Sequence, residues 1–234
     1  MAQHFSKTNF LQSGTPLVVG AVSSAEMLRQ LVATPPTTAD CDYLELRLDL
    51  IGLTPSEAAA LAGQLPLPLL ITARHPEEGG QGHLTTAQRL ELLEAVLPHA
   101  TLVDIELRSA PEMLSFMRKA QAQKVGVIGS YHDFDTTPTV ETMLGAAEFA
   151  YQCRVDVVKL ATKLNGPEDL TRLMQVLNQE KRLSLSIMGM GELGRISRLT
   201  LAKCGSVLNY GYLGESNAPG QWPARRLKEL LGEL

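Results

Sequence analysis

Short apolar runs rich in β-branched residues alternate with amphipathic stretches along the 234 residues of this chain. The strand-like runs lie at residues 17–21, 43–48, 69–73, 102–107, 125–131, 155–160, 183–188 and 206–210. The helix-like stretches between them include residues 85–97, 111–123, 139–151 and 167–178. Strands that alternate with helices pair in parallel, because each helix returns the chain to the starting end of the sheet. Eight such units in a chain of this length predict an α/β fold, a single (β/α)8 TIM barrel.

The alternation runs through the chain without a break. No linker, low-complexity segment or run of like charges marks a domain boundary, so we predict one barrel domain over residues 1–234. Within it, residues 1–15 are expected to form a short N-terminal extension. Local signals support the helix positions, because Pro167 suits a first helical turn and Ser109 or Thr137 suits an N-cap.

Composition and charge exclude several classes of function. A formal net charge of -4 and a pI of about 5.8 give no basic surface for nucleic acid. The first residues lead into polar sequence, and no apolar run approaches the roughly 20 residues that cross a bilayer. The cysteines, at positions 41, 153 and 204, are odd in number and far apart, which indicates reduced thiols. We therefore predict a cytoplasmic protein with a small-molecule substrate, no nucleic-acid partner and no membrane partner.

Two neighbouring strand-like runs end in reactive side chains. His132 follows the run at 125–131, and Lys159 stands near the end of the run at 155–160. Burial disfavours the charged form of a lysine, which lowers its pKa and frees the amine as a nucleophile. A histidine is the usual proton carrier near neutral pH. Because barrel strands present chemistry at their carboxyl ends, the pair predicts an enzyme that forms an imine with a carbonyl compound and moves protons on it.

Further charged side chains lie at the carboxyl ends of the other strands. They are Glu45, Arg47, Asp49, Arg74, Glu78, Asp104 and Glu106. Their convergence on one face predicts a polar site that tolerates anions. Structural interpretations stay open from the residues alone, since Lys159 could pair with a carboxylate such as Glu106 and the charges around Arg47 could form an ion-pair layer.

Several motifs, taken together and in order, resemble the type I 3-dehydroquinate dehydratases. They are residues 45–49 (ELRLD), 72–74 (TAR), 78–80 (EGG), 130–134 (SYHDF), 159–161 (KLA), 188–190 (MGM), 196–198 (ISR) and 218–221 (APGQ). The likeness extends from about residue 16 to residue 230. It implies dehydration of 3-dehydroquinate to 3-dehydroshikimate in the shikimate pathway, which leads to aromatic amino acids. It also implies a lysine imine, and neither a metal nor another cofactor.

The resemblance assigns catalytic roles to three residues. Lys159 would attack the ketone, and imine formation would acidify the adjacent carbon. His132 would remove that proton, protonate the departing hydroxyl, and help to form and hydrolyse the imine. Glu78 would hydrogen-bond His132 and set its tautomer.

The resemblance also implies a set of substrate-binding residues. Arg198 would hold the substrate carboxylate, since a guanidinium fork matches two carboxylate oxygens. Glu45, Arg47 and Arg74 would meet the ring hydroxyls or orient one another. Gln221 would reach in from a loop that closes over the substrate and excludes water. Because the outer helices of such barrels often form interfaces, a homodimer is left open.

This chain departs from the family pattern at three positions. Asn217 stands where a serine is common in the closing loop, and an amide can still hydrogen-bond a hydroxyl or carboxylate. Gly20 stands where some members have serine, so one polar contact is expected to be missing. Tyr210 replaces the more usual phenylalanine near the site.

Other functions remain to be weighed against this one. Residues 189–194 spell G-x-G-x-x-G, a dinucleotide-binding signature, but they follow the seventh strand rather than the first, which favours an ordinary barrel loop. The same loop could hold the phosphate of a sugar phosphate in a lysine-dependent aldolase. A catalytically silent barrel that binds a metabolite is the third alternative. Intact Lys159, His132 and Glu78 argue against the silent barrel.

Overall fold

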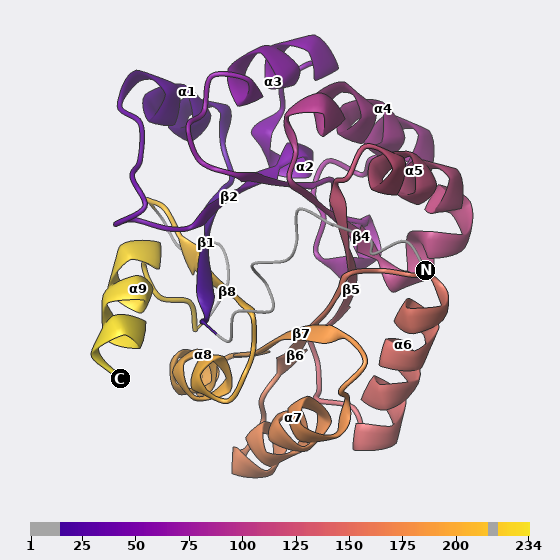
Figure 1. Cartoon of the computed structure of the whole chain (residues 1–234), viewed down its shortest axis with the longest axis vertical. Helices are drawn as coiled ribbons and strands as arrows, with labels where there is room; N and C mark the ends of the chain where they lie inside the picture. The colour runs from indigo at the N-terminus through magenta and orange to yellow at the C-terminus, as the bar shows by residue number, and fades with distance from the viewer. Residues whose placement is uncertain (1–14, 215–219) are drawn as a thin grey trace.

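The eight strands form one parallel sheet that curves into a nearly closed barrel, and the helices surround it (Figure 1). The computed structural model describes residues 15–214 and 220–234. The strands are β1 (Leu17–Val22), β2 (Tyr43–Arg47), β3 (Leu69–Thr72), β4 (Leu102–Glu106), β5 (Gly126–Asp133), β6 (Val157–Lys163), β7 (Ser184–Met190) and β8 (Leu208–Tyr212). Their order, β7-β6-β5-β4-β3-β2-β1-β8, follows the sequence around the barrel and confirms the predicted fold class.

Helices connect the carboxyl end of each strand to the start of the next. The α-helices are α1 (Ala25–Ala33), α2 (Leu48–Ile51), α3 (Pro55–Ala62), α4 (Thr86–Val96), α5 (Ala110–Ala122), α6 (Val140–Gln152), α7 (Pro167–Gln179), α8 (Gly194–Lys203) and α9 (Ala224–Glu233). Short 3-10 turns are η2 (Pro76–Glu78), η3 (Leu97–His99) and η4 (Leu107–Ser109). In the described parts of the chain, no helix is both long enough and apolar enough to cross a bilayer.

Serine hydroxyls close the seam between β7 and β8. The Ser206 hydroxyl accepts from the Ile187 amide at 2.9 Å and lies 3.2 Å from the Ile187 carbonyl, to which it donates. The Ser186 hydroxyl donates to the Leu208 carbonyl at 2.6 Å. The backbone amide of Ser206 donates to the Leu201 carbonyl at the end of α8, and β8 begins at Leu208 rather than at the predicted residue 206. Side-chain hydrogen bonds thus replace part of the backbone ladder at the last joint of the barrel.

The helix caps agree only in part with the sequence signals. Pro167 occupies the first turn of α7, as predicted. Thr139, not Thr137, caps α6, because its side chain accepts from the Thr142 amide. The Thr137 hydroxyl instead donates to the Lys163 carbonyl at 2.8 Å. Ser109 precedes α5 but makes no capping hydrogen bond.

Apolar side chains fill two regions on either side of the strands. The larger cluster packs the outer face of the strands against the helices, and the smaller one fills the barrel interior. Cys41 is buried, Cys153 is half-buried and Cys204 is exposed, and each carries a free thiol. The N-terminal extension predicted over residues 1–15 lies outside the described residues except at Thr15.

Candidate active site

The barrel interior is layered, because alternate residues of each strand point to the same face. The apolar layer contains Val19, Tyr43, Leu70, Leu102, Ile128, Val157 and Leu208. Two positions further along five neighbouring strands, buried polar side chains take over: Glu45, Thr72, Asp104, Ser130 and Lys159. Two positions further again stand Arg47, Arg74, Glu106 and His132. The polar residues that interrupt the apolar runs therefore gather at the carboxyl end of the barrel.

Lys159 projects from β6 into this polar layer with only 5% of its surface exposed. Its Nζ donates to Asp104 Oδ2 at 3.1 Å and lies 4.0 Å from Glu45 Oε1. The ring of Tyr210 lies beneath the amine, with 4.0 Å from Nζ to the ring centroid. Burial lowers the pKa of Lys159 below its ordinary value, against the opposing pull of Asp104 and Glu45. The amine is thus more readily deprotonated than that of an exposed lysine.

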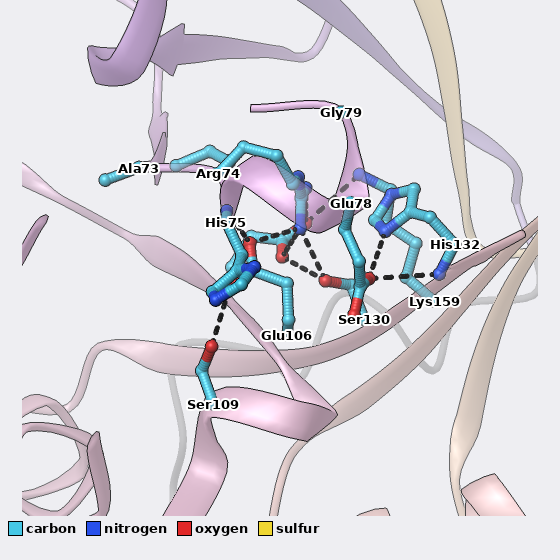
Figure 2. A network of polar contacts seen from close by, with 12 residues as sticks. Ala73, Arg74, His75, Glu78, Gly79, Glu106, Ser109, Ser130, His132 and Lys159 are labelled. Carbon is cyan, nitrogen blue, oxygen red and sulfur yellow. Dashed lines mark hydrogen bonds and ion pairs between the residues drawn. The ribbon is translucent and has the colours of Figure 1, made fainter. Parts of the chain in front are cut away.

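His132 stands on β5, the strand beside β6, and is held by Glu78 from η2. Figure 2 shows Glu78 pointing at His132, with contacts to both its ring and its backbone nitrogen. Glu78 Oε2 lies 2.9 Å from His132 Nδ1 and accepts from the His132 amide at 3.1 Å. An ionised Glu78 fixes the proton on Nδ1, which leaves Nε2 free to accept a proton.

The protonation states of this couple are set mainly by burial. Burial and the positive charge of Arg74 and Lys159 hold the pKa of His132 well below its usual value, so the imidazole is neutral at pH 7. Burial, with repulsion from Glu106, raises the pKa of Glu78 to about 7. Above about pH 7 the site therefore holds a neutral imidazole beside an ionised carboxylate, the arrangement that a general base needs.

The pH dependence of stability should report the raised pKa of Glu78. The folded state binds this proton more tightly than the unfolded chain, so stability is lost as pH rises from about 4.5 to about 7. Glu78→Gln removes the titration. Its free energy of unfolding relative to wild type should therefore increase across this window, by about 3 kcal/mol. Urea unfolding of both proteins from pH 5 to pH 8 measures this, and a difference independent of pH would contradict it.

Arg74 links three strands at the centre of the polar layer. Its Nη1 donates to Asp104 Oδ1 and Glu106 Oε1, both at 2.9 Å, and to the Ser130 hydroxyl at 2.7 Å. Its Nη2 donates to Asp104 Oδ2 at 2.8 Å. Figure 2 shows the guanidinium turned toward Glu106 and Ser130. Arg74 therefore holds Asp104, the carboxylate that contacts Lys159, in place.

Replacing Arg74 should destabilise the barrel. Arg74→Ala leaves Asp104 and Glu106 buried with one cation fewer, and breaking a buried ion pair typically costs about 3–5 kcal/mol. Arg108→Ala is the matched control, because Arg108 pairs with Glu77 at the surface and such pairs contribute about 0–1 kcal/mol. Urea unfolding at fixed pH compares the two variants. Equal losses of stability in Arg74→Ala and Arg108→Ala would show that the buried ion pairs of Arg74 stabilise the barrel no more than a surface pair does.

Sequence reasoning missed Arg89 on α4, which is fully buried. Its Nε donates to the Ala73 carbonyl at 2.6 Å, and its guanidinium pairs with Glu106. Glu106 thereby neutralises two arginines rather than Lys159. A signal was present, because Arg89 precedes the buried Leu92, Leu93 and Val96 at helical spacing and so shares their inward face.

Arg198 and Gln221 approach the site from α8 and from the segment before α9. Arg198 donates to two backbone carbonyls, from Nε to Gly220 at 3.2 Å and from Nη1 to Tyr210 at 3.1 Å. Its partners within the described residues include no carboxylate, and burial lowers its pKa to about 10. Gln221 Oε1 is also buried, and it has no hydrogen-bond partner among the residues that the structure describes. Both groups are available to a ligand.

Arg47 is held at the mouth of the site by Asp49. Its Nε donates to Asp49 Oδ1 at 2.9 Å and its Nη2 to Asp49 Oδ2 at 2.7 Å. Asp49 also accepts from the backbone amide of Arg74 at 3.2 Å. Asp49 therefore orients Arg47 rather than facing a ligand itself.

These residues line one pocket at the carboxyl end of the barrel. Its lining comprises Ala21, Glu45, Arg47, Arg74, Glu78, Gly79, His132, Phe134, Lys159, Ala161, Met188, Met190, Arg198, Tyr210 and Gln221. The eight residues predicted from the sequence to form the site, Lys159, His132, Glu78, Glu45, Arg47, Arg74, Arg198 and Gln221, all belong to it. No three His, Cys, Asp or Glu side chains are arranged to hold a metal ion in the residues that the structure describes.

One sequence expectation about a glycine changes. Gly20 does not face the pocket, because a Cβ there would meet Leu213 and Cys41 on the outer side of β1, whereas Ala21 lines the pocket. A serine at position 20 would not reach the pocket, so the glycine there does not deprive the site of a polar contact. Gly189 and Gly194 serve close packing, since a Cβ on Gly189 would clash with Leu164 Cδ1 and one on Gly194 would lie 2.9 Å from the Gly220 Cα. Asn217 lies outside the described residues.

Comparisons with known proteins agree with this geometry. A family model described as type I 3-dehydroquinase matches residues 17–234. A 3-dehydroquinate dehydratase of Methanococcoides burtonii is 32% identical over 222 residues, which cover 92% of this chain and 93% of that protein. That of Methanocaldococcus jannaschii is 35% identical over 193 residues, 81% of this chain and 86% of that protein. The crystal structure of 3-dehydroquinate dehydratase from Geobacillus kaustophilus superposes with a TM-score of 0.84 at 30% identity, covering 94% of this chain and 91% of that one.

Proposed function

The chain belongs to the type I 3-dehydroquinase family, hydro-lyases that dehydrate 3-dehydroquinate in the shikimate pathway, and we propose that it does so through an imine on Lys159. The main support for this proposal is that Lys159 lines the same pocket as His132 and its partner Glu78. An amine with a lowered pKa and a neutral imidazole on the next strand are the two groups that imine chemistry requires.

The reaction begins with attack of the deprotonated Lys159 amine on the ketone carbon. The C–N bond forms, the former ketone oxygen takes one proton from the attacking nitrogen and one from solvent, and it leaves as water. A protonated imine remains. The imine draws electrons from the adjacent carbon, which lowers the pKa of its C–H bond. Asp104, 3.1 Å from Nζ, favours the positively charged nitrogen that this step creates.

His132 then moves the proton. Its Nε2 takes the proton from the carbon beside the imine and returns it to the departing hydroxyl, which leaves as water. Glu78 keeps Nδ1 protonated and stabilises the imidazolium that forms between these steps. A water molecule then adds to the imine carbon, the C–N bond breaks, and Lys159 is released. The net change is the loss of one water from the substrate.

Arg198 would hold the carboxylate of the substrate. It is a buried guanidinium whose described partners are backbone carbonyls, so a bound carboxylate would supply the missing negative charge. This arrangement also favours the dehydratase over a sugar-phosphate aldolase. The glycine loop at 189–194, the candidate phosphate cradle of an aldolase, is packed closely against Gly220.

Replacing Arg198 should weaken substrate binding more than it slows chemistry. Arg198→Met should lower kcat/KM for 3-dehydroquinate by about 100-fold, mainly through KM, because a charged hydrogen-bonded contact is worth about 1.5–3 kcal/mol. Steady-state kinetics measures the change. Wild type should bind the methyl ester of the substrate as weakly as the variant does. The carboxylate would bind elsewhere if the variant kept the wild-type KM for 3-dehydroquinate. The same would follow if both proteins preferred 3-dehydroquinate over its methyl ester by the same factor.

The proposed function is tested by incubating the purified chain with 3-dehydroquinate. Dehydration creates a conjugated enone, whose ultraviolet absorbance reports the rate directly. We expect turnover with 3-dehydroquinate and no cleavage of ketose phosphates. Folded protein that dehydrates nothing would overturn the proposal and favour a barrel that only binds a metabolite.

A further inference from the structure

Tyr210 presents an unusual polar group at the active-site pocket. It lies on β8, is 3% exposed and lines the pocket. Its hydroxyl is buried, and within residues 15–214 and 220–234 it has no hydrogen-bond partner. Leaving a buried hydroxyl unpaired is unfavourable, and most buried polar groups in proteins are satisfied. A phenylalanine would fill the same space without this penalty. We therefore expect the hydroxyl to find its hydrogen-bond partner on a bound ligand.

The position of Tyr210 indicates which part of a ligand it would meet. Lys159 Nζ sits 4.0 Å from the centroid of its ring. The phenolic oxygen lies in the plane of that ring, at one end, so it can meet an oxygen on the carbon bonded to Nζ when that oxygen is directed over the hydroxyl end of the ring. Burial and the nearby carboxylates Glu45 and Asp104 hold the pKa of Tyr210 well above its usual value. The hydroxyl is therefore protonated and can donate.

The neighbouring guanidinium groups direct their N–H groups to other oxygens. The Nη1 of Arg74 is engaged by Asp104, Glu106 and Ser130. Arg198 directs Nε and Nη1 to the carbonyls of Gly220 and Tyr210 itself. The carbonyl oxygen of a ketone becomes negatively charged as an amine attacks its carbon, and a donor aimed at that oxygen speeds the attack.

We propose that the Tyr210 hydroxyl is a further substrate-contacting group, which donates a hydrogen bond to the oxygen of the ketone carbon that Lys159 attacks. As the Nζ lone pair forms the C–N bond, the π electrons of the carbonyl move onto that oxygen, and the hydroxyl stabilises the charge without giving up its proton. The inference rests on the imine mechanism proposed above. It assigns a role to the position where this chain carries tyrosine in place of phenylalanine.

The test compares wild type with Tyr210→Phe in a single turnover. Each protein is mixed with 3-dehydroquinate and quenched with borohydride at increasing times, and the reduced adduct is measured by mass spectrometry. We expect Tyr210→Phe to form the adduct at least about tenfold more slowly, the effect of losing a donor at a developing oxyanion. Its urea midpoint should equal or exceed that of wild type, because the variant loses only an unpaired hydroxyl.

Tyr43→Phe is the matched control, since Tyr43 is a buried tyrosine of the barrel interior that does not line the pocket. It should form the adduct at the wild-type rate. Equal rates for Tyr210→Phe and wild type would overturn the role of Tyr210 while leaving the imine mechanism intact. A lower urea midpoint for Tyr210→Phe would show that the hydroxyl already has a partner in the free protein, and would also overturn the inference. Absence of adduct in wild type would overturn the imine mechanism and this proposal with it.

Discussion

Lys159→Ala should lower kcat for dehydration of 3-dehydroquinate by at least about 10⁴-fold, because removal of a covalent nucleophile eliminates the pathway through the intermediate. The variant should remain folded, since Asp104 keeps its contacts with Arg74 and Ser130. Initial rates from the absorbance of the enone product, together with circular dichroism, measure both expectations.

A matched control for this variant lies on the same strand. Lys163 is at the end of β6 and is exposed, so Lys163→Ala should leave kcat within about twofold of wild type. Substantial activity in Lys159→Ala, or a comparable loss in Lys163→Ala, would contradict the assignment of the nucleophile.

His132→Gln should lower kcat by about 10³-fold, within the range that general acid–base catalysis contributes. The glutamine keeps a polar side chain beside Glu78 but cannot accept and return a proton. Because Lys159 is untouched, the covalent intermediate should still form and should accumulate. Quenched-flow trapping with borohydride, alongside steady-state kinetics, detects this separation of the two steps.

The control for His132 is an exposed histidine at the other end of the barrel. His99 belongs to η3, which precedes β4, and His99→Gln should behave as wild type. If His132→Gln lost the intermediate altogether, His132 would be required for attack rather than for the later proton transfers. If it kept full activity, another group would be the base.

Hydrophobic periodicity was sufficient to predict the barrel. Each predicted strand overlaps an observed one, because parallel strands covered by helices read as continuous apolar runs. The errors lie at strand ends. Strand β5 continues to Asp133 and β6 to Lys163, beyond the last apolar residues. Polar residues end an apolar pattern in the sequence, but in the barrel they extend the strand into a polar interior.

Most of the candidate site could be placed from the sequence because its residues lie at the carboxyl ends of strands, whereas Arg198 and Gln221 were assigned only through the family resemblance. Lys159 and His132 stand on adjacent strands, so the carboxyl-end rule brings them together without knowledge of loops. The partners of each charge could not be assigned. Lys159 contacts Asp104 and not Glu106, since the two carboxylates lie in different layers and Arg89 reaches Glu106 from a helix. Contacts between a helix and a strand end depend on the angle of approach, which periodicity does not encode.

The central claim is that Lys159 forms an imine with the substrate, and peptide mass spectrometry after borohydride reduction tests it most directly. The account predicts one reduced adduct when 3-dehydroquinate is present, located on the peptide that contains Lys159 and absent without the ketone. Active protein that yields no adduct, or an adduct on another lysine, would contradict the mechanism.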